Sequence, residues 1–214
     1  MPHPIWPLAD LEVVTPRLTL RYVSDALAVE LALLAAAGIH DPAVQPFAEP
    51  WTDVASPELE RNALRYYWRT RAETTTEHWD LCLAALVDET VVGTCALHAE
   101  QFPARRTATT GSWLGRGHQG RGLGREMREA ALHLLFDGLG ARRAVTRAWH
   151  DNAPSLGVTR SLPYTRTATT MEQRRDRRET MVEYVMTAEQ WRPIRRDDIG
   201  LNGVDGVRAQ LQIG

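Results

Sequence analysis

The residues best suited to chemistry are the glycines of one short segment, Ser112–Gly124, with the sequence SWLGRGHQGRGLG. Glycines at positions 120, 122 and 124 let backbone N–H groups approach an anion closely. The residues that follow have helical spacing, and a helix N-terminus presents free N–H groups and partial positive charge. The segment therefore predicts a phosphate or pyrophosphate site, with tight packing of the glycines as the alternative.

Two familiar phosphate-binding motifs do not account for this segment. A P-loop needs a lysine after its last glycine, and every one of the 25 basic residues of this chain is an arginine. A dinucleotide-binding fingerprint opens a strand–helix–strand unit, whereas this segment lies late in the chain, after a predicted hairpin. The segment therefore needs another kind of fold around it.

The elements that must position the segment follow from hydrophobic periodicity. Apolar runs at Leu81–Val87 and Val91–Leu97 surround Asp88-Glu89 and predict a β-hairpin with a two-residue loop. A long helix is expected over Gly120–Asp137, where apolar residues recur at helical spacing. Further strands are expected at 17–23, 111–114, 143–149, 164–170 and 181–186, and further helices after residue 24, after residue 56 and over 154–161.

The predicted hairpin also relates the two cysteines of the chain. Regular pairing outward from a two-residue loop sets Cys82 opposite Cys95, close enough for a disulfide. Two cysteines cannot form a metal site alone and suggest a reducing compartment, which favours free thiols. We expect no metal.

Composition limits the class of protein. The 214 residues, 43% hydrophobic, suit one domain over 1–214, with a core at about 12–191 and a weakly ordered tail at 192–214. The net charge of −2 argues against a dedicated nucleic-acid binder. The longest apolar run, Leu31–Ala37, is much shorter than the ~20 residues that span a bilayer, and the first residues lack a signal-peptide pattern. We expect a cytoplasmic protein with no membrane or nucleic-acid partner.

Three segments of the chain resemble one known family. Gln119–Gly124 is similar to the phosphate motif Gln/Arg-x-x-Gly-x-Gly/Ala of the GNAT family of acyl-CoA-dependent N-acyltransferases. Asn152–Val158 resembles the second signature of that family, and Thr15–Leu18 resembles the opening of its branch of ribosomal-protein N-terminal acetyltransferases. The resemblance covers about residues 12–191.

Within that branch, two segments resemble a bacterial subgroup that includes a succinyl-CoA-dependent enzyme. They are Pro46–Thr52 and Gly111–Gly115. The subgroup carries an acidic residue where this chain has Thr109 and a glycine where it has Pro163. Both departures concern the catalytic region.

The resemblance implies an α/β (α+β) fold with a central, mostly antiparallel sheet flanked by helices. The sheet is expected to splay in its middle, where the Ser112 strand and the Val145 strand separate. The donor is then acetyl-CoA or another short acyl-CoA, without a metal. The resemblance assigns CoA contacts to Trp113, Leu114, Gln119, Gly120, Arg121, Gly122, Leu123, Gly124, Arg125, Asn152 and Ser155.

The resemblance also places two catalytic side chains, Ser155 and Tyr164, near the thioester sulfur. A helix-cap role for Ser155 and a core role for Tyr164 are the alternatives. The base that accepts the amine proton is Glu100, His98, His118 or an ordered water, and Glu100 is the candidate taken forward.

Other residues bear on the acceptor. The walls of its site are expected among the aromatic residues Phe47, Trp51, Tyr66 and Tyr67, for which a core position is the alternative. The arginines of Arg174–Arg178 either recognise an anion or form the solvated tip of the last hairpin.

The favoured hypothesis is an enzyme that moves an acetyl or succinyl group from CoA to a primary amine of a small molecule or protein. A homodimer is compatible with it. A catalytically weak acyl-CoA sensor is the alternative, encouraged by Thr109 in place of an acid. The third hypothesis is nucleotide binding without acyl chemistry, which predicts that the protein binds ATP or NAD and has no affinity for CoA.

Overall fold

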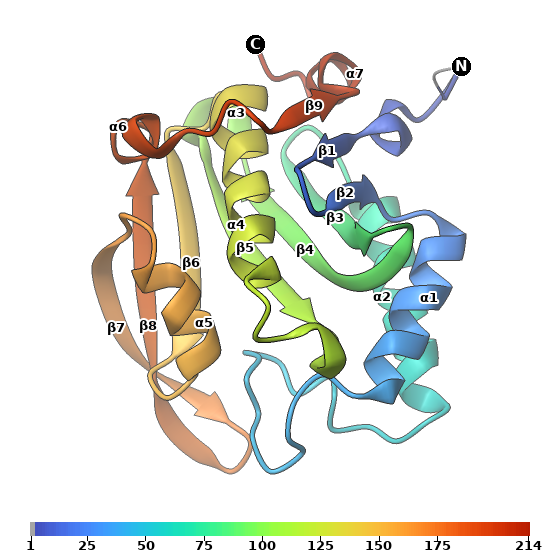
Figure 1. Ribbon diagram of the computed structural model, residues 1–214, viewed down its shortest axis with the longest axis vertical. Helices are drawn as coiled ribbons and strands as arrows, with labels where there is room; N and C mark the ends of the chain where they lie inside the picture. The colour runs from blue at the N-terminus through green and yellow to red at the C-terminus, as the bar shows by residue number, and fades with distance from the viewer. Residues whose placement is uncertain (1–2) are drawn as a thin grey trace.

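Nine strands form one sheet in the computed structural model, which describes residues 3–214. Their order across the sheet is β7-β8-β6-β5-β4-β3-β2-β1-β9, and only β5 and β6 run parallel (Figure 1). The strands are β1 Glu12–Val14, β2 Thr19–Tyr22, β3 His78–Val87, β4 Thr90–Glu100, β5 Thr107–Leu114, β6 Arg143–Trp149, β7 Thr165–Arg174, β8 Arg177–Thr187 and β9 Gly200–Asn202. The fold is the mostly antiparallel α/β sheet that the resemblance implies.

Helices cover both faces of this sheet. The α-helices are α1 Asp25–Ala37, α2 Glu58–Glu73, α3 Phe102–Arg105, α4 Leu123–His133, α5 Ala153–Arg160, α6 Ala188–Trp191 and α7 Val204–Gln210. The shorter helical turns are η1 Pro7–Asp10, η2 Arg116–His118, η3 Leu134–Gly138 and η4 Arg192–Ile194. Apolar residues of α4 and α7 share one core with the sheet, and those of α1 and α2 share a second core on the opposite side. We call these two sides the α4 face and the α1–α2 face.

The fork in the sheet lies between β5 and β6. The two strands pair from Thr107 opposite Arg143 to Thr110 opposite Thr146, and beyond that point each continues without the other. We call the unpaired parts, residues 111–114 of β5 and 147–149 of β6, the fork. It confirms the splay that the resemblance implies, and α4 and α5 lie in front of the diverging strands (Figure 1).

The long helix begins later than its periodicity predicts. Gly120 and Gly122 have positive φ angles of +73° and +80°, a left-handed conformation that does not continue a right-handed helix. α4 therefore starts at Leu123, with Gly122 as its N-cap residue. Leu123 and Met127 are buried on the face toward the sheet, as the spacing predicts.

The hairpin of β3 and β4 has the predicted two-residue turn but not the predicted register. Asp88 and Glu89 both have positive φ, as the tight hairpin turn requires. Between Ala85 and Leu86, however, the register shifts by one residue, which leaves Val92 as the extra residue of a β-bulge. A pair of adjacent valines carries no local signal for such a bulge.

The prediction that the two cysteines face each other is therefore wrong. Cys82 pairs with Ala96 and Cys95 pairs with Leu83. Because neighbouring side chains of a strand alternate, Cys82 belongs to the core of the α1–α2 face and Cys95 to the core of the α4 face. Both thiols are free and buried, and burial raises the pKa of Cys82 to about 11 and of Cys95 to about 12.

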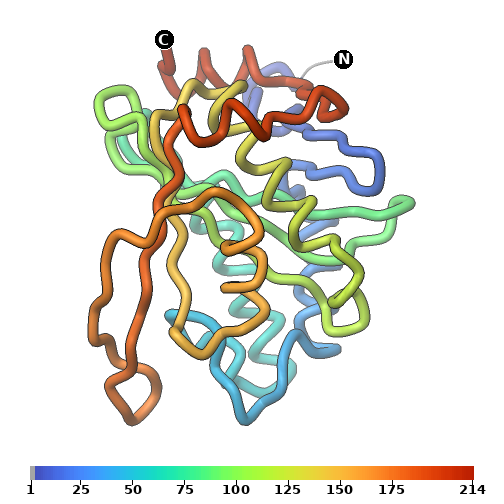
Figure 2. Tube along the Cα trace, turned by 60° about the vertical axis from the view of Figure 1, so that its left-hand side comes forward, coloured from blue at the N-terminus to red at the C-terminus, as the bar shows by residue number. Residues whose placement is uncertain are grey.

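The expectation of a weakly ordered tail is also wrong. After α6 the chain crosses the sheet and ends in β9 and α7, close to its own beginning (Figure 2). β9 pairs with β1, and Val207, Leu211 and Ile213 are buried in the core of the α4 face. None of the helices in residues 3–214 combines the length and apolar character that a membrane span requires.

Candidate active site

The fork exposes backbone groups of β5 on the side that faces β6. The amide of Gly115 donates to the carbonyl oxygen of Val92 at 2.9 Å, which fixes the residues that pair with β4. Because backbone groups alternate in direction along an antiparallel pair, Trp113 also pairs with β4, while Ser112 and Leu114 point theirs toward the fork. The Leu114 carbonyl accepts from the Gln119 side chain, so the Leu114 N–H and the backbone groups of Ser112 can bond to an extended molecule inserted between the strands.

Residues 120–124, which we call the glycine turn, follow the end of the same strand after the short η2. No side chain caps α4, so the N–H groups of its first turn, including Leu123 and Gly124, have no partner within the helix. A Cβ atom on Gly124 would lie at an ordinary contact distance of 3.7 Å from Leu114 and Val158, so neither packing nor a positive φ requires a glycine there. The geometry is that of a glycine turn before an uncapped helix N-terminus, as the sequence predicts.

Gln119, assigned to CoA from the resemblance, uses its side chain inside the protein. Its amide nitrogen donates to the carbonyl oxygens of Ile39 at 2.7 Å and Leu114 at 2.8 Å. The side chain therefore fastens the glycine turn to the end of α1 and to the end of β5. It positions the turn, a role that the motif alone does not reveal.

Arg17 and Glu126 secure the other side of the turn. Arg17 donates to the carbonyl oxygen of Arg121 at 3.1 Å and forms an ion pair with Glu126, which also accepts from the Thr15 hydroxyl at 2.7 Å. Burial alone would raise the pKa of Glu126, but the hydrogen bonds from Thr15 and Arg17 outweigh it and lower that pKa below its ordinary value. The segment Thr15–Leu18 thus supports the glycine turn.

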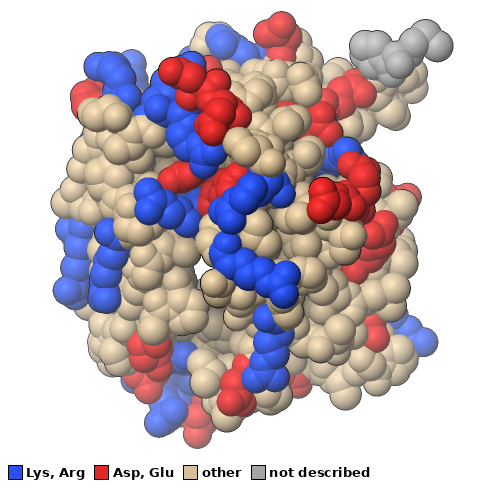
Figure 3. Space-filling view, viewed as in Figure 1, with Lys and Arg blue, Asp and Glu red and all other residues tan. Residues whose placement is uncertain are grey.

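A cavity of about 480 Å³ lies beside the N-terminus of α4. Its lining joins the turn, the end of α5 and the segment after α6: Arg17, Gly122, Arg125, Glu126, Glu129, Ser161, Leu162, Pro163, Ile194 and Arg196. Basic side chains run down the middle of this side of the molecule beside a hollow (Figure 3). Glu129 pairs with both Arg125, at 2.9 Å, and Arg196, at 2.7 Å, and Arg125 is the more exposed of the two arginines, at 55%.

The second signature forms the start of α5. The Asn152 side chain accepts from the amide of Ser155 at 3.2 Å and donates to the carbonyl oxygen of Pro46 at 3.2 Å. Asn152 is therefore the helix cap, and Ser155 lies in the first turn of the helix, half-buried. The Tyr164 hydroxyl lies 3.5 Å from the buried Arg128 of α4, so Tyr164 belongs to the α4 face.

The loop of residues 40–55, which we call the clasp loop, passes below the fork. The indole N–H of Trp149, at the end of β6, donates to the carbonyl oxygen of Phe47 at 2.8 Å. On the α1–α2 face, the rings of Phe47 and Trp51 lie 5.1 Å apart and those of Trp51 and Trp113 lie 6.0 Å apart. These aromatic residues thus gather at the fork. Tyr67 of α2 is buried in the core of the α1–α2 face, and Tyr66 lies beside Cys82.

The arginine-rich hairpin tip is not a simple solvated turn. Arg175 forms an ion pair with Asp53 of the clasp loop at 2.7 Å, and Arg174 forms one with Asp151 at 2.8 Å while its guanidinium lies over the Trp149 ring. The tip of β7–β8 and the clasp loop lie side by side at the bottom of the molecule (Figure 1). These two arginines close the fork from below rather than bind an anion.

The base candidates lie in two places, with His98 beside Glu100 and His118 elsewhere. His98 and Glu100 share the α1–α2 face, and His98 lies opposite Thr109 near the branch point of the fork. The hydrogen bond to Asp80 raises the pKa of His98, and the one from His78 lowers that of Glu100. His118 lies in η2, next to the glycine turn instead. Glu100 is further from the fork than His98, beyond the last β4–β5 pair.

Comparisons with known proteins agree with this geometry. Residues 17–165 match the family model of the acetyltransferase (GNAT) domain. RimL, a ribosomal α-N-protein acetyltransferase in complex with coenzyme A, has 18% identity and a TM-score of 0.67 over 81% of this chain and 96% of its own.

Two further solved structures are similar. A ribosomal-protein-serine acetyltransferase from Vibrio cholerae has 20% identity and a TM-score of 0.62 over 84% of this chain and 98% of its own. A microcin self-immunity acetyltransferase in complex with acetyl-CoA and AMP has 17% identity and a TM-score of 0.63 over 80% and 93%. At identities of 17–20% these structures show a shared fold. Membership of the family rests on the family model, which matches most of the chain. This chain therefore belongs to the GNAT family of acyl-CoA-dependent N-acetyltransferases.

Proposed function

We propose that this protein transfers a short acyl group, acetyl or succinyl, from CoA to a primary amine of a small molecule or protein. The observation that carries the proposal is the fork beside the uncapped N-terminus of α4. The amides of pantetheine match the strand groups that Ser112 and Leu114 direct toward the fork. The pyrophosphate matches the free N–H groups that follow Gly122.

The donor site then extends from the fork to the cavity beside α4. The turn of residues 120–125 holds the pyrophosphate, and Arg17 and Arg125 offset the charge of the phosphates. Gln119 and Asn152 act by holding the turn and α5 in place, since their side chains already bond to protein groups.

The transfer forms one bond and breaks one bond. The amine nitrogen attacks the thioester carbonyl carbon, the C–N bond forms, and the C–S bond breaks. The Leu114 amide polarises the carbonyl, and Ser155 or Tyr164 delivers a proton to the departing sulfur. The proton of the amine leaves toward the α1–α2 face, where β4 carries Glu100 and His98.

The donor site is tested with two glycine variants. Gly122→Val places a side chain where the turn needs φ of +80°, and Gly140→Val places the same side chain at φ of +67° beyond the far end of α4. Each lost hydrogen bond to a phosphate costs about 1.5–3 kcal/mol, so CoA affinity of Gly122→Val should fall roughly tenfold or more. Calorimetry should show nearly wild-type affinity for Gly140→Val, and an unchanged Gly122→Val would refute the site.

Transfer itself is tested by release of free CoA. Acetyl-CoA and succinyl-CoA are mixed with a library of amines, and the amide products are identified by mass spectrometry. The likeness to an α-N-protein acetyltransferase favours peptide α-amines as the first acceptors to try. CoA binding without turnover on any amine would favour the sensor, and binding of ATP or NAD without affinity for CoA would contradict both.

A further inference from the structure

Four ionisable side chains lie together on the α1–α2 face, and the proposed reaction accounts for only some of them. His78 and Asp80 lie on β3, and His98 and Glu100 lie on β4, at the ends of the strands away from their turn. Residues two apart on a strand share a face, and the register sets His78 opposite Glu100 and Asp80 opposite His98. Strand pairing alone thus gathers two imidazoles and two carboxylates.

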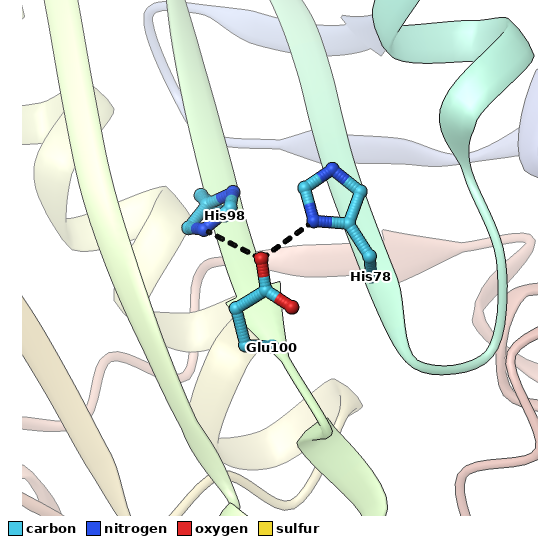
Figure 4. Close-up of side chains that lie close together, drawn as sticks. All are labelled: His78, His98 and Glu100. Atoms are coloured by element: carbon cyan, nitrogen blue, oxygen red, sulfur yellow. Dashed lines mark hydrogen bonds and ion pairs between the residues drawn. The ribbon is translucent and has the colours of Figure 1, made fainter.

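The inner atoms of this group surround one point. Glu100 Oε1 lies 2.7 Å from His78 Nδ1 and 3.8 Å from His98 Nε2 (Figure 4). One ligand atom from each of the three residues lies within 4.8 Å of the other two. Around a tetrahedral ion with bonds of ~2.0–2.2 Å, ligand atoms are about 3.4 Å apart. The two measured contacts bracket that spacing, so small side-chain rotations suffice to bring all three atoms onto one ion.

Asp80 lies on the outer side of both rings. Its Oδ1 is 3.0 Å from His98 Nδ1, and its Oδ2 is 3.8 Å from His78 Nε2. A carboxylate that accepts a proton-bearing Nδ1 leaves the lone pair of the imidazole on Nε2, which is the nitrogen that faces Glu100. Asp80 therefore positions His98 for metal binding.

We propose that His78, His98 and Glu100 bind a Zn²⁺ ion. Two neutral imidazoles and one carboxylate are a ligand set that zinc favours. Glu100 is 49% exposed, so a fourth position faces solvent and can take a water molecule. The ion would compete with any proton-accepting role of Glu100, but its binding does not depend on acyl transfer and is measured without a donor.

The test is calorimetric titration of the chelator-treated full chain with zinc chloride. We expect one ion per chain, and affinity at least roughly tenfold weaker in His78→Ala and in Glu100→Gln. His150→Ala is the matched control, because His150 is exposed elsewhere on the surface, and it should bind like the wild type. Equal affinity in the wild type, His78→Ala and Glu100→Gln would overturn the proposal.

Two further measurements distinguish a specific zinc site from an effect of the substitutions on folding. Asp80→Asn should lower zinc affinity by about 10–100-fold, with an unchanged melting temperature of the zinc-free protein, and Asp80→Glu should recover part of it. X-ray absorption at the zinc edge should show nitrogen and oxygen ligands with two imidazoles. Zinc bound through fewer imidazoles, or lost equally in His150→Ala, would show binding to scattered surface histidines and refute the site.

Discussion

Glu126 joins three segments at the entrance to the donor site. It is 4% exposed, yet it is an anion beside a turn that we propose to bind another anion. The Thr15 hydroxyl and the Arg17 guanidinium satisfy its oxygens, and Arg17 reaches on to the carbonyl of Arg121 in the turn. The carboxylate therefore fixes the arginine that the phosphates need.

The lowered pKa of Glu126 makes its contribution to stability depend on pH. A carboxyl whose pKa is lower in the folded than in the unfolded chain stabilises the fold above the unfolded value and loses this effect as pH falls through the folded value. At pH 7, the free energy of unfolding of Glu126→Gln should be about 1–3 kcal/mol lower than that of the wild type. The difference should shrink as pH falls below the ordinary value of 4.5. Denaturant unfolding from pH 7 to pH 3 measures it, and a constant difference would contradict the assignment.

The sequence predicts those site residues whose role depends on local backbone geometry. Gly120 and Gly122 are recognisable because a tight turn before a helix needs residues that tolerate positive φ. The pairing of His78 with Glu100 could not be predicted, because it depends on the register of two strands rather than on spacing. The two cysteines of the sequence therefore gave no indication of the proposed site.

The C-terminal elements belong to the structural core of the protein. β9 extends the sheet beyond β1, and α7 packs near η1 at the same edge. Gly203 fits here only without a side chain, because a Cβ would lie 2.3 Å from the carbonyl oxygen of Asp10. At least one of the four glycines in the tail at 192–214 thus allows close packing.

This packing predicts the effect of a core truncation in the last residues. Leu211 is 1% exposed, and Leu211→Ala should lower the free energy of unfolding by roughly 2–5 kcal/mol. Leu33 of α1 is 59% exposed and provides the matched control, since Leu33→Ala should change the free energy of unfolding by less than about 0.5 kcal/mol. Thermal or denaturant unfolding compares the two, and equal effects would mean that the last helix does not contribute to the core.

Element types were more predictable than the relations between elements. The two-residue turn of the β3–β4 hairpin follows from the polar residues between two apolar runs. The bulge at Val92 does not, because the two adjacent valines of β4 give no sign of which one is the extra residue. A shift of one residue then moves Cys95 away from Cys82 and onto the other face.

At the scale of the whole molecule, the sheet separates the proposed donor site from the proposed acceptor site. The glycine turn, α4 and Tyr164 lie on one face, and the aromatic residues of the clasp loop lie with α1 and α2 on the other. The fork joins the two sides, and the clasp loop and the hairpin tip close it from below. We therefore place the donor on the α4 face and the acceptor on the α1–α2 face.

This arrangement has a consequence for the order of events in turnover. A donor that enters from one face leaves the other face open, so both substrates can be present at once and the acyl group can pass directly between them. Initial rates measured at several fixed concentrations of the second substrate should give double-reciprocal lines that intersect. Incubation with the donor alone should leave the mass of the protein unchanged. Parallel lines, or an acylated protein, would show instead that the chain itself carries the group between two separate half-reactions.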